Sequence, residues 1–90
     1  MGATAETAGF TLPLREFYRC DGGKAYTVQY YGANRATVTT STGGRYELPA
    51  TTAASGYAFG GETVSFTLPA LGQGKLEGAD DGPFTNCVAG

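Results

Sequence analysis

Few residues of this 90-residue chain are of the types that perform chemistry. The sequence contains no histidine, the side chain most often used as a general base near neutral pH. Ser55 therefore has no histidine to activate it, and neither Lys24 nor Lys75 forms a recognisable serine–lysine motif with it. Asp80 and Asp81 are adjacent carboxylates, but they stand in a turn sequence, and neighbouring side chains of an extended chain point apart. We expect no catalytic residues and no enzyme activity.

Metal and cofactor sites are not indicated either. A zinc site would draw on histidines or on closely spaced cysteine pairs, and this chain has neither. Gly72 and Gly74 resemble part of a glycine-rich phosphate loop, but no helix pattern follows them. We therefore expect no metal ion and no cofactor.

The overall composition excludes two further classes of protein. Six Lys and Arg against eight Asp and Glu give a net charge of −2, without the basic stripe of a nucleic-acid binder. No apolar run approaches the ~18 residues of a membrane span. Fifteen glycines and eleven Phe and Tyr residues are spread along the chain, which is typical of a turn-rich folded domain.

Cys20 and Cys87 lie near the two ends of the patterned sequence. One even pair in a small exported domain is typical of a disulfide, although two unrelated thiols in a cytosolic protein remain the alternative. Residues 1–7 show neither a basic nor an apolar signal-peptide region, so we expect a mature exported chain. Cys20 follows Tyr18-Arg19 and not small residues, which argues against a lipid anchor there. We predict a periplasmic or secreted location.

The elements that must position any site are short strands. Polar and apolar residues alternate with a period of two, and Gly, Asn, Asp or Pro separates the runs. No stretch keeps the 3.6-residue period of a helix. Pro49 is expected to end one run, with residues 50–54 forming a loop. The predicted strands are residues 14–20, 25–30, 35–39, 45–48, 57–59, 63–68, 75–77 and 84–88.

Eight short antiparallel strands in one small domain favour a barrel over a sandwich, because closure removes exposed sheet edges. We predict an all-β fold, a small eight-stranded antiparallel barrel with one disulfide. Residues 1–11 are expected to form a loose N-terminal arm, and residues 12–90 the barrel domain.

Two features could form a binding surface. Five tyrosines could supply interface contacts, although wall positions of a barrel explain most of them better. Ser55-Gly56 ends a segment of small residues, and glycine there permits a positive φ, so this segment could enter a cleft. The five tyrosines are Tyr26, Tyr30, Tyr31, Tyr46 and Tyr57.

Four short motifs, in this order and spacing, give the chain a family resemblance. They are Phe17-Tyr18-Arg19-Cys20, the strand from Tyr26 to Tyr30, Ala54-Ser55-Gly56-Tyr57-Ala58-Phe59, and Phe84-Thr85-Asn86-Cys87. The third resembles a signature S-G-x-x-Y, with Phe59 in the place of its tyrosine. Together the motifs resemble the periplasmic and membrane-bound inhibitors of c-type lysozyme, over about residues 17–88.

This resemblance implies an eight-stranded barrel whose first and last strands are joined by the Cys20–Cys87 disulfide. It implies that the protein inhibits a c-type lysozyme, with Ser55, Gly56, Tyr57 and Phe59 as the lysozyme-binding residues. Ser55 matches the serine that hydrogen-bonds to the catalytic carboxylates of the enzyme. The expected partner is a lysozyme and not a nucleic acid, and a homodimer is left open.

Two positions depart from the family pattern. The family usually has a lysine about ten positions after the aromatic residue of the signature, where this chain has Pro69. Phe59 also lacks the hydroxyl of the usual tyrosine. The alternative function is therefore a non-enzymatic cell-envelope domain that binds glycan or another protein through exposed tyrosines.

Overall fold

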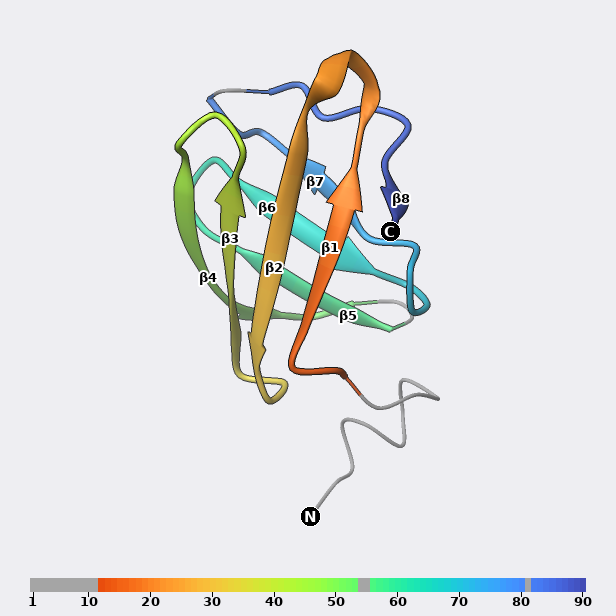
Figure 1. The fold of residues 1–90 in the computed structure, drawn as a ribbon. Coiled ribbons are helices and arrows are strands. Elements are labelled where there is room, and N and C mark those ends of the chain that lie inside the picture. Colours follow the sequence, from red (N-terminus) through yellow and green to blue (C-terminus); the bar gives the residue numbers. More distant parts are fainter. Residues whose placement is uncertain (1–11, 54–55, 81) are drawn as a thin grey trace.

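The computed structural model describes residues 12–53, 56–80 and 82–90. Eight strands and one 3₁₀ turn follow each other along the chain (Figure 1). The arm predicted for residues 1–11 lies outside the described residues. The elements are β1 (Arg15–Arg19), η1 (Asp21–Gly23), β2 (Ala25–Tyr31), β3 (Arg35–Thr40), β4 (Arg45–Thr51), β5 (Tyr57–Gly60), β6 (Ser65–Leu68), β7 (Lys75–Glu77) and β8 (Val88–Ala89).

All eight strands belong to one antiparallel sheet in the order β7-β6-β5-β4-β3-β2-β1-β8. The sheet curls around a single core, so that β5, β6 and β7 lie behind β1 and β2 (Figure 1). Among the described residues no strand pairing joins β7 to β8, and the fold is a curled half-barrel. The prediction of an all-β fold with eight antiparallel strands is confirmed.

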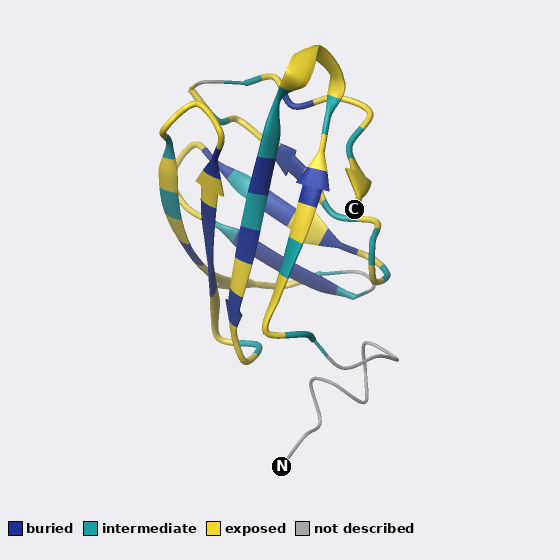
Figure 2. Cartoon of the chain, in the orientation of Figure 1, coloured by how far each residue is buried: buried dark blue, intermediate teal, exposed yellow. Residues whose placement is uncertain are grey.

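The period of two is clearest in β2, where it places the core residues on the concave side. In β2, Tyr26, Val28 and Tyr30 are buried, while the alternate residues face outward and are more exposed (Figure 2). Aromatic side chains dominate the centre. The rings of Tyr18 and Tyr26 stack at 5.1 Å, and that of Phe66 meets the Tyr26 ring edge-on at 6.1 Å. Such contacts add directional packing to the burial of apolar area.

β4 is longer than the sequence pattern indicated. Pro49 does not end the strand, which continues to Thr51, so the loop predicted from residue 50 was wrong for its first two residues. Pro49 pairs with Arg35 of β3, whereas Ala50 pairs with Phe59 of β5. The strand thus changes partner directly after a residue that cannot donate to a ladder. This change of partner is how β4 belongs to both halves of the curled sheet.

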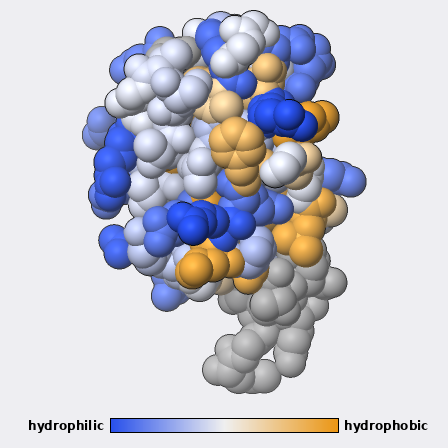
Figure 3. All heavy atoms as spheres, in the orientation of Figure 1, coloured by the Kyte–Doolittle hydropathy of each residue, from blue (hydrophilic) through white to orange (hydrophobic). Residues whose placement is uncertain are grey.

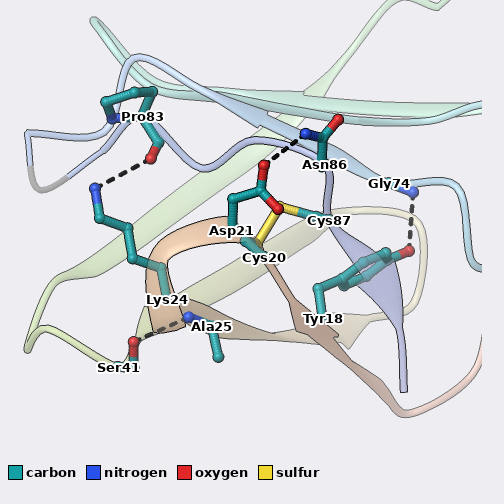
Figure 4. Close-up of a disulfide and its surroundings, with 10 residues drawn as sticks. All are labelled: Tyr18, Cys20, Asp21, Lys24, Ala25, Ser41, Gly74, Pro83, Asn86 and Cys87. Atoms are coloured by element: carbon teal, nitrogen blue, oxygen red, sulfur yellow. Dashed lines mark hydrogen bonds between the residues drawn. A yellow bond between two sulfur atoms is a disulfide. The ribbon is translucent and has the colours of Figure 1, made fainter.

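The predicted disulfide is present between Cys20, directly after β1, and Cys87, directly before β8. Hydrogen bonds flank it: Asn86 Nδ2 donates to Asp21 Oδ2 at 2.6 Å (Figure 4), and the Asp21 amide donates to the Thr85 carbonyl at 2.9 Å. β8 has only two residues paired with β1. The disulfide therefore fixes a chain end that the short ladder alone would hold weakly.

The outer surface carries scattered apolar side chains among polar ones. Phe17, on the outward side of β1, is 43% exposed, and Val88 of β8 is 57% exposed. Figure 3 shows apolar atoms over β1 and β8 interspersed with hydrophilic ones. In the part of the chain that the structure describes, no helix is long and apolar enough to cross a membrane.

Candidate functional site

Gly56 stands at the start of the turn into β5, where the backbone has φ +67°. A Cβ at this position would overlap the carbonyl oxygen of Leu68 and lie 2.7 Å from the Cα of Pro69. Only glycine fits here, because the backbone is left-handed and presses against another backbone. Ser55 itself lies outside the described residues, so its predicted role stays a prediction.

Tyr57 and Phe59, which were also predicted to bind lysozyme, lie in β5 and are 5% and 1% exposed. The Phe59 ring packs 5.9 Å from that of Tyr30 in the core. Ala58 between them is 8% exposed, so the first three residues of this strand are buried. Of the predicted binding residues, Gly56 directly precedes β5, whereas the side chains of Tyr57 and Phe59 are buried in the core.

The second element at this end is the connection from β6 to β7. After Leu68 and Pro69 the chain makes a tight turn, closed by a hydrogen bond of 3.0 Å from the Gln73 amide to the Ala70 carbonyl. Leu71 at its tip is 49% exposed. This turn, residues 70–74, directly follows Pro69, against which Gly56 packs. Gly56 and the 70–74 turn therefore form adjacent parts of one surface.

A carboxylate that the sequence did not single out holds the 70–74 turn. Glu16 Oε2 accepts a hydrogen bond of 3.0 Å from the Gly72 amide, and its Oε1 accepts from the hydroxyls of Tyr18 and Tyr30 at 3.0 and 2.8 Å. The Tyr18 hydroxyl also accepts from the Gly74 amide at 2.9 Å (Figure 4). The sequence showed that Glu16 lies on the same strand face as Tyr18. It did not show that both would contact a turn more than fifty residues away.

Three tyrosine hydroxyls sit in this interior. Burial is the main cause that raises the pKa of Tyr18, Tyr26 and Tyr30 above the ordinary tyrosine value, and the negative charge of Glu16 adds to it. The Tyr26 hydroxyl is buried and has no hydrogen-bond partner within the described residues. These groups are neutral donors at physiological pH and offer no acid–base chemistry.

The exposed-tyrosine surface of the alternative function does not form. Tyr26, Tyr30 and Tyr57 are core residues, and Tyr46 is half-buried. Tyr31 is 37% exposed, and its ring is covered by the guanidinium of Arg35, 4.4 Å from the ring centroid. The wall positions expected for most of these tyrosines are thus confirmed.

Neither lysine occupies the place of the family lysine. Pro69 stands there, packed against Gly56. Lys75 lies on β7, with its ammonium 3.5 Å from the Glu77 carboxylate. Lys24 donates to the Pro83 carbonyl at 3.2 Å, at the other end of the domain (Figure 4). Among the described residues, Gly56 is therefore in contact with the backbone of Leu68 and Pro69, and a lysine stands at neither family position.

A surface hollow lies between the 70–74 turn and the segment that precedes β8. It has a volume of about 540 Å³ and is lined by residues 72–75 and 84–87. Lys75 is the only titratable side chain in its lining, since Cys87 is in the disulfide. No group of His, Cys, Asp and Glu able to hold a metal ion occurs among the described residues. The hollow offers no constellation of catalytic groups.

Comparison with known proteins gives one match. A family model described as membrane-bound lysozyme-inhibitor of c-type lysozyme matches residues 18–77, more than half of the chain. The matched region contains Gly56, the 70–74 turn and seven of the eight strands in whole or in part. Searches of curated proteins and of solved structures returned no match. On the strength of the family match, the chain belongs to the MliC family of membrane-bound inhibitors of c-type lysozyme.

Proposed function

We propose that the protein inhibits a c-type lysozyme by placing the loop around Ser55 and Gly56 in the active-site cleft of the enzyme. Family membership implies lysozyme inhibition and a c-type lysozyme as the partner. The observation that supports this loop is the backbone of Gly56, held at φ +67° against Leu68 and Pro69. A chain so constrained at its base binds with less loss of conformational freedom than a flexible loop.

The chemistry of the target suits a serine. A retaining glycosidase works with two nearby carboxyl groups, one protonated and one ionised. In the proposed complex the Ser55 hydroxyl donates to the ionised carboxylate and accepts from the protonated one, while the loop excludes sugar and water. Such a partner matters, because carboxyl groups buried without hydrogen bonds are unfavourable.

Tyr57 and Phe59 contribute to the same proposal from below the surface. Their side chains anchor β5 in the core, and Tyr57 pairs with Leu68 in the neighbouring strand. The loop is therefore presented by a packed strand and not by a flexible hinge. In this proposal their role is to hold Gly56 at the end of the domain, and direct contact with lysozyme belongs to Ser55 and Gly56.

Charge and compartment agree with this partner. The chain has a net charge of −2, and c-type lysozymes are basic as a family, so opposite charge would speed encounter. The disulfide and the family description favour an oxidising, envelope-associated location, periplasmic or secreted. The protein acts as an inhibitor that occupies the catalytic groups of its target, without catalysis of its own.

The test is a pair of serine variants. Ser55→Ala should weaken inhibition of cell-wall lysis about tenfold or more with an unchanged melting temperature, because in this proposal the hydroxyl acts on the partner. Ser41→Ala is the matched control: the Ser41 Oγ accepts from the Ala25 amide at 3.0 Å, so this variant should lose about 1 kcal/mol of stability and inhibit normally. Equal inhibition by the two variants would refute the role of Ser55.

A further inference from the structure

Glu16 uses both carboxylate oxygens in hydrogen bonds. Oε1 accepts from two tyrosine hydroxyls, of Tyr18 and Tyr30, and Oε2 accepts from the amide of Gly72. The side chain is only half-buried, and its three donors come from β1, β2 and the 70–74 turn. Charge-assisted hydrogen bonds of this kind are stronger than neutral ones. Glu16 thus joins the turn to both strands on the far side of the open half-barrel.

Tyr18 makes a second link to the same turn. Its hydroxyl donates to Glu16 and accepts from the Gly74 amide, so one hydroxyl connects the carboxylate to the backbone. The turn approaches Tyr18 closely, because a Cβ at Gly74 would lie 2.8 Å from the Tyr18 oxygen. On this side of the molecule, side-chain hydrogen bonds from β1 take the place of a backbone ladder.

The 70–74 turn leads directly to the candidate loop. Pro69 precedes the turn, and its Cα, together with the Leu68 carbonyl, forms the surface on which Gly56 rests. Two residues separate Pro69 from Gly72, and the hydrogen bond from Gln73 to Ala70 keeps that connection tight. A displacement of Gly72 should therefore also displace Pro69 and the Leu68 carbonyl, against which Gly56 packs.

We propose that Glu16 is a positioning residue for the Ser55–Gly56 loop: its carboxylate, with the Tyr18 hydroxyl, fixes the 70–74 turn against which Gly56 is seated. This inference rests on the proposed function for its effect on inhibition. The structural part of the proposal, that Glu16 positions Gly56 through the turn, rests on the hydrogen bonds and the backbone contact and does not require the proposed function. Neither Glu16 nor Tyr18 touches the partner in this proposal; both act through the turn.

The experiment compares Glu16→Gln with Glu47→Gln in the full chain. Both variants remove one negative charge, but Glu47 is exposed and pairs with Arg45 on its own strand, at 3.4 Å. Amide resonances and hydrogen exchange would be followed at Gly72, Gly74 and Gly56, with Val28 and Val38 as core references. Inhibition of c-type lysozyme would be measured well below the melting temperature of each variant.

In Glu16→Gln we expect shifted resonances at all three glycines, exchange at Gly72 at least about tenfold faster, core amides unchanged, and inhibition about tenfold weaker. Glu47→Gln should change none of these. Unmoved Gly72 or Gly56 resonances in folded Glu16→Gln, or inhibition equal to that of Glu47→Gln, would overturn the proposal. Faster exchange at the core amides as well would also overturn it, since Glu16 would then be a general stability residue.

A second variant covers the case in which Glu16→Gln does not fold. Tyr18→Phe removes the acceptor of the Gly74 amide and one donor to Glu16, while it keeps the ring in the core. It should perturb Gly74 and Gly56 and weaken inhibition in the same direction, and an undisturbed Gly56 would refute the link. If wild-type protein fails to inhibit any c-type lysozyme, the proposed function falls, while the glycine resonances still decide whether Glu16 positions Gly56.

Discussion

At the residue scale, single atoms decide what the candidate loop can be. Gly56 has no room for a Cβ, because the Leu68 carbonyl already occupies that place. At Glu16, by contrast, a partly buried carboxylate is stabilised by three hydrogen-bond donors. The Tyr26 hydroxyl is buried and forms no hydrogen bond with any described residue. A single substitution at each of these positions tests the contact described.

Gly56→Ala should cost more stability than a glycine replacement at a similar backbone angle. Gly32, with φ +59°, is the matched control, because nothing lies within 4 Å of a Cβ there. Gly32→Ala should lose about 1–2 kcal/mol of unfolding free energy through the left-handed backbone alone. Gly56→Ala should lose distinctly more, and it should also abolish inhibition. Equal losses in urea unfolding would show that the contact with Leu68 is not tight.

Tyr26→Phe should stabilise the protein. The variant removes a hydroxyl that is desolvated without a hydrogen bond, so the unfolding free energy should rise by about 1 kcal/mol. Tyr30→Phe is the contrast, because it deletes a hydrogen bond of 2.8 Å to a carboxylate and should lose about 1.5–3 kcal/mol. A stability loss in Tyr26→Phe, measured by urea unfolding, would show that this hydroxyl has a partner in solution.

At the element scale, the strand pattern carried most of the fold prediction. Alternation located the strands from β1 to β7, because a half-buried strand must place apolar residues at every second position. The strand predicted for residues 84–88 was wrong for most of its length, since β8 comprises Val88–Ala89. The pattern failed after Pro49, since a change of pairing partner within β4 has no signature in one sequence. It also missed Glu16, because alternation gives the face of a residue and not the distant turn that meets it.

The three buried tyrosines of β1 and β2 should make the free energy of unfolding sensitive to alkaline pH. Tyr18, Tyr26 and Tyr30 have a pKa raised by burial, so above about pH 10 the unfolded state loses protons that the folded state keeps. The stabilisation is complete below about pH 10 and is lost as pH rises, by up to about 1.4 kcal/mol per pH unit for each tyrosine. Urea unfolding between about pH 9 and about pH 11.5 measures this.

The control for that experiment is Tyr30→Phe, which has one buried tyrosine fewer. It should show a shallower decline of unfolding free energy with pH than the wild type. A wild-type stability that stays level across this range would contradict the burial of the three hydroxyls. Deprotonation of Tyr18, Tyr26 or Tyr30 in the folded protein near pH 10, resolved ring by ring, would contradict it as well.

At the scale of the whole molecule, three kinds of interaction hold the half-barrel together. Backbone ladders join neighbouring strands, the disulfide fixes the short β8, and the side chains of Glu16 and Tyr18 reach the 70–74 turn. The sequence predicted the first two, since strand patterns and cysteine positions are local features. The third, and the packing of Gly56 on Pro69, depend on the assembled fold.

Replacement of both Cys20 and Cys87 by serine should lower stability strongly. The disulfide closes a loop with a sequence separation of 67, which in the chain-entropy model contributes roughly 4 kcal/mol. Because β8 pairs with β1 at only two positions, the loss should begin at the C-terminal end. Hydrogen exchange should therefore rise first at Gly90 and Asp21, whose amides bond across this junction. A double variant with wild-type unfolding free energy would contradict this.

The central claim is that this protein inhibits a c-type lysozyme, and the rate of cell-wall lysis tests it most directly. Purified c-type lysozyme would be titrated with the wild-type protein, and the clearing of a cell-wall suspension would be followed. The account predicts that the initial rate falls in proportion to the added protein and approaches zero in stoichiometric excess. A lysis rate that stays unchanged in such an excess would contradict it.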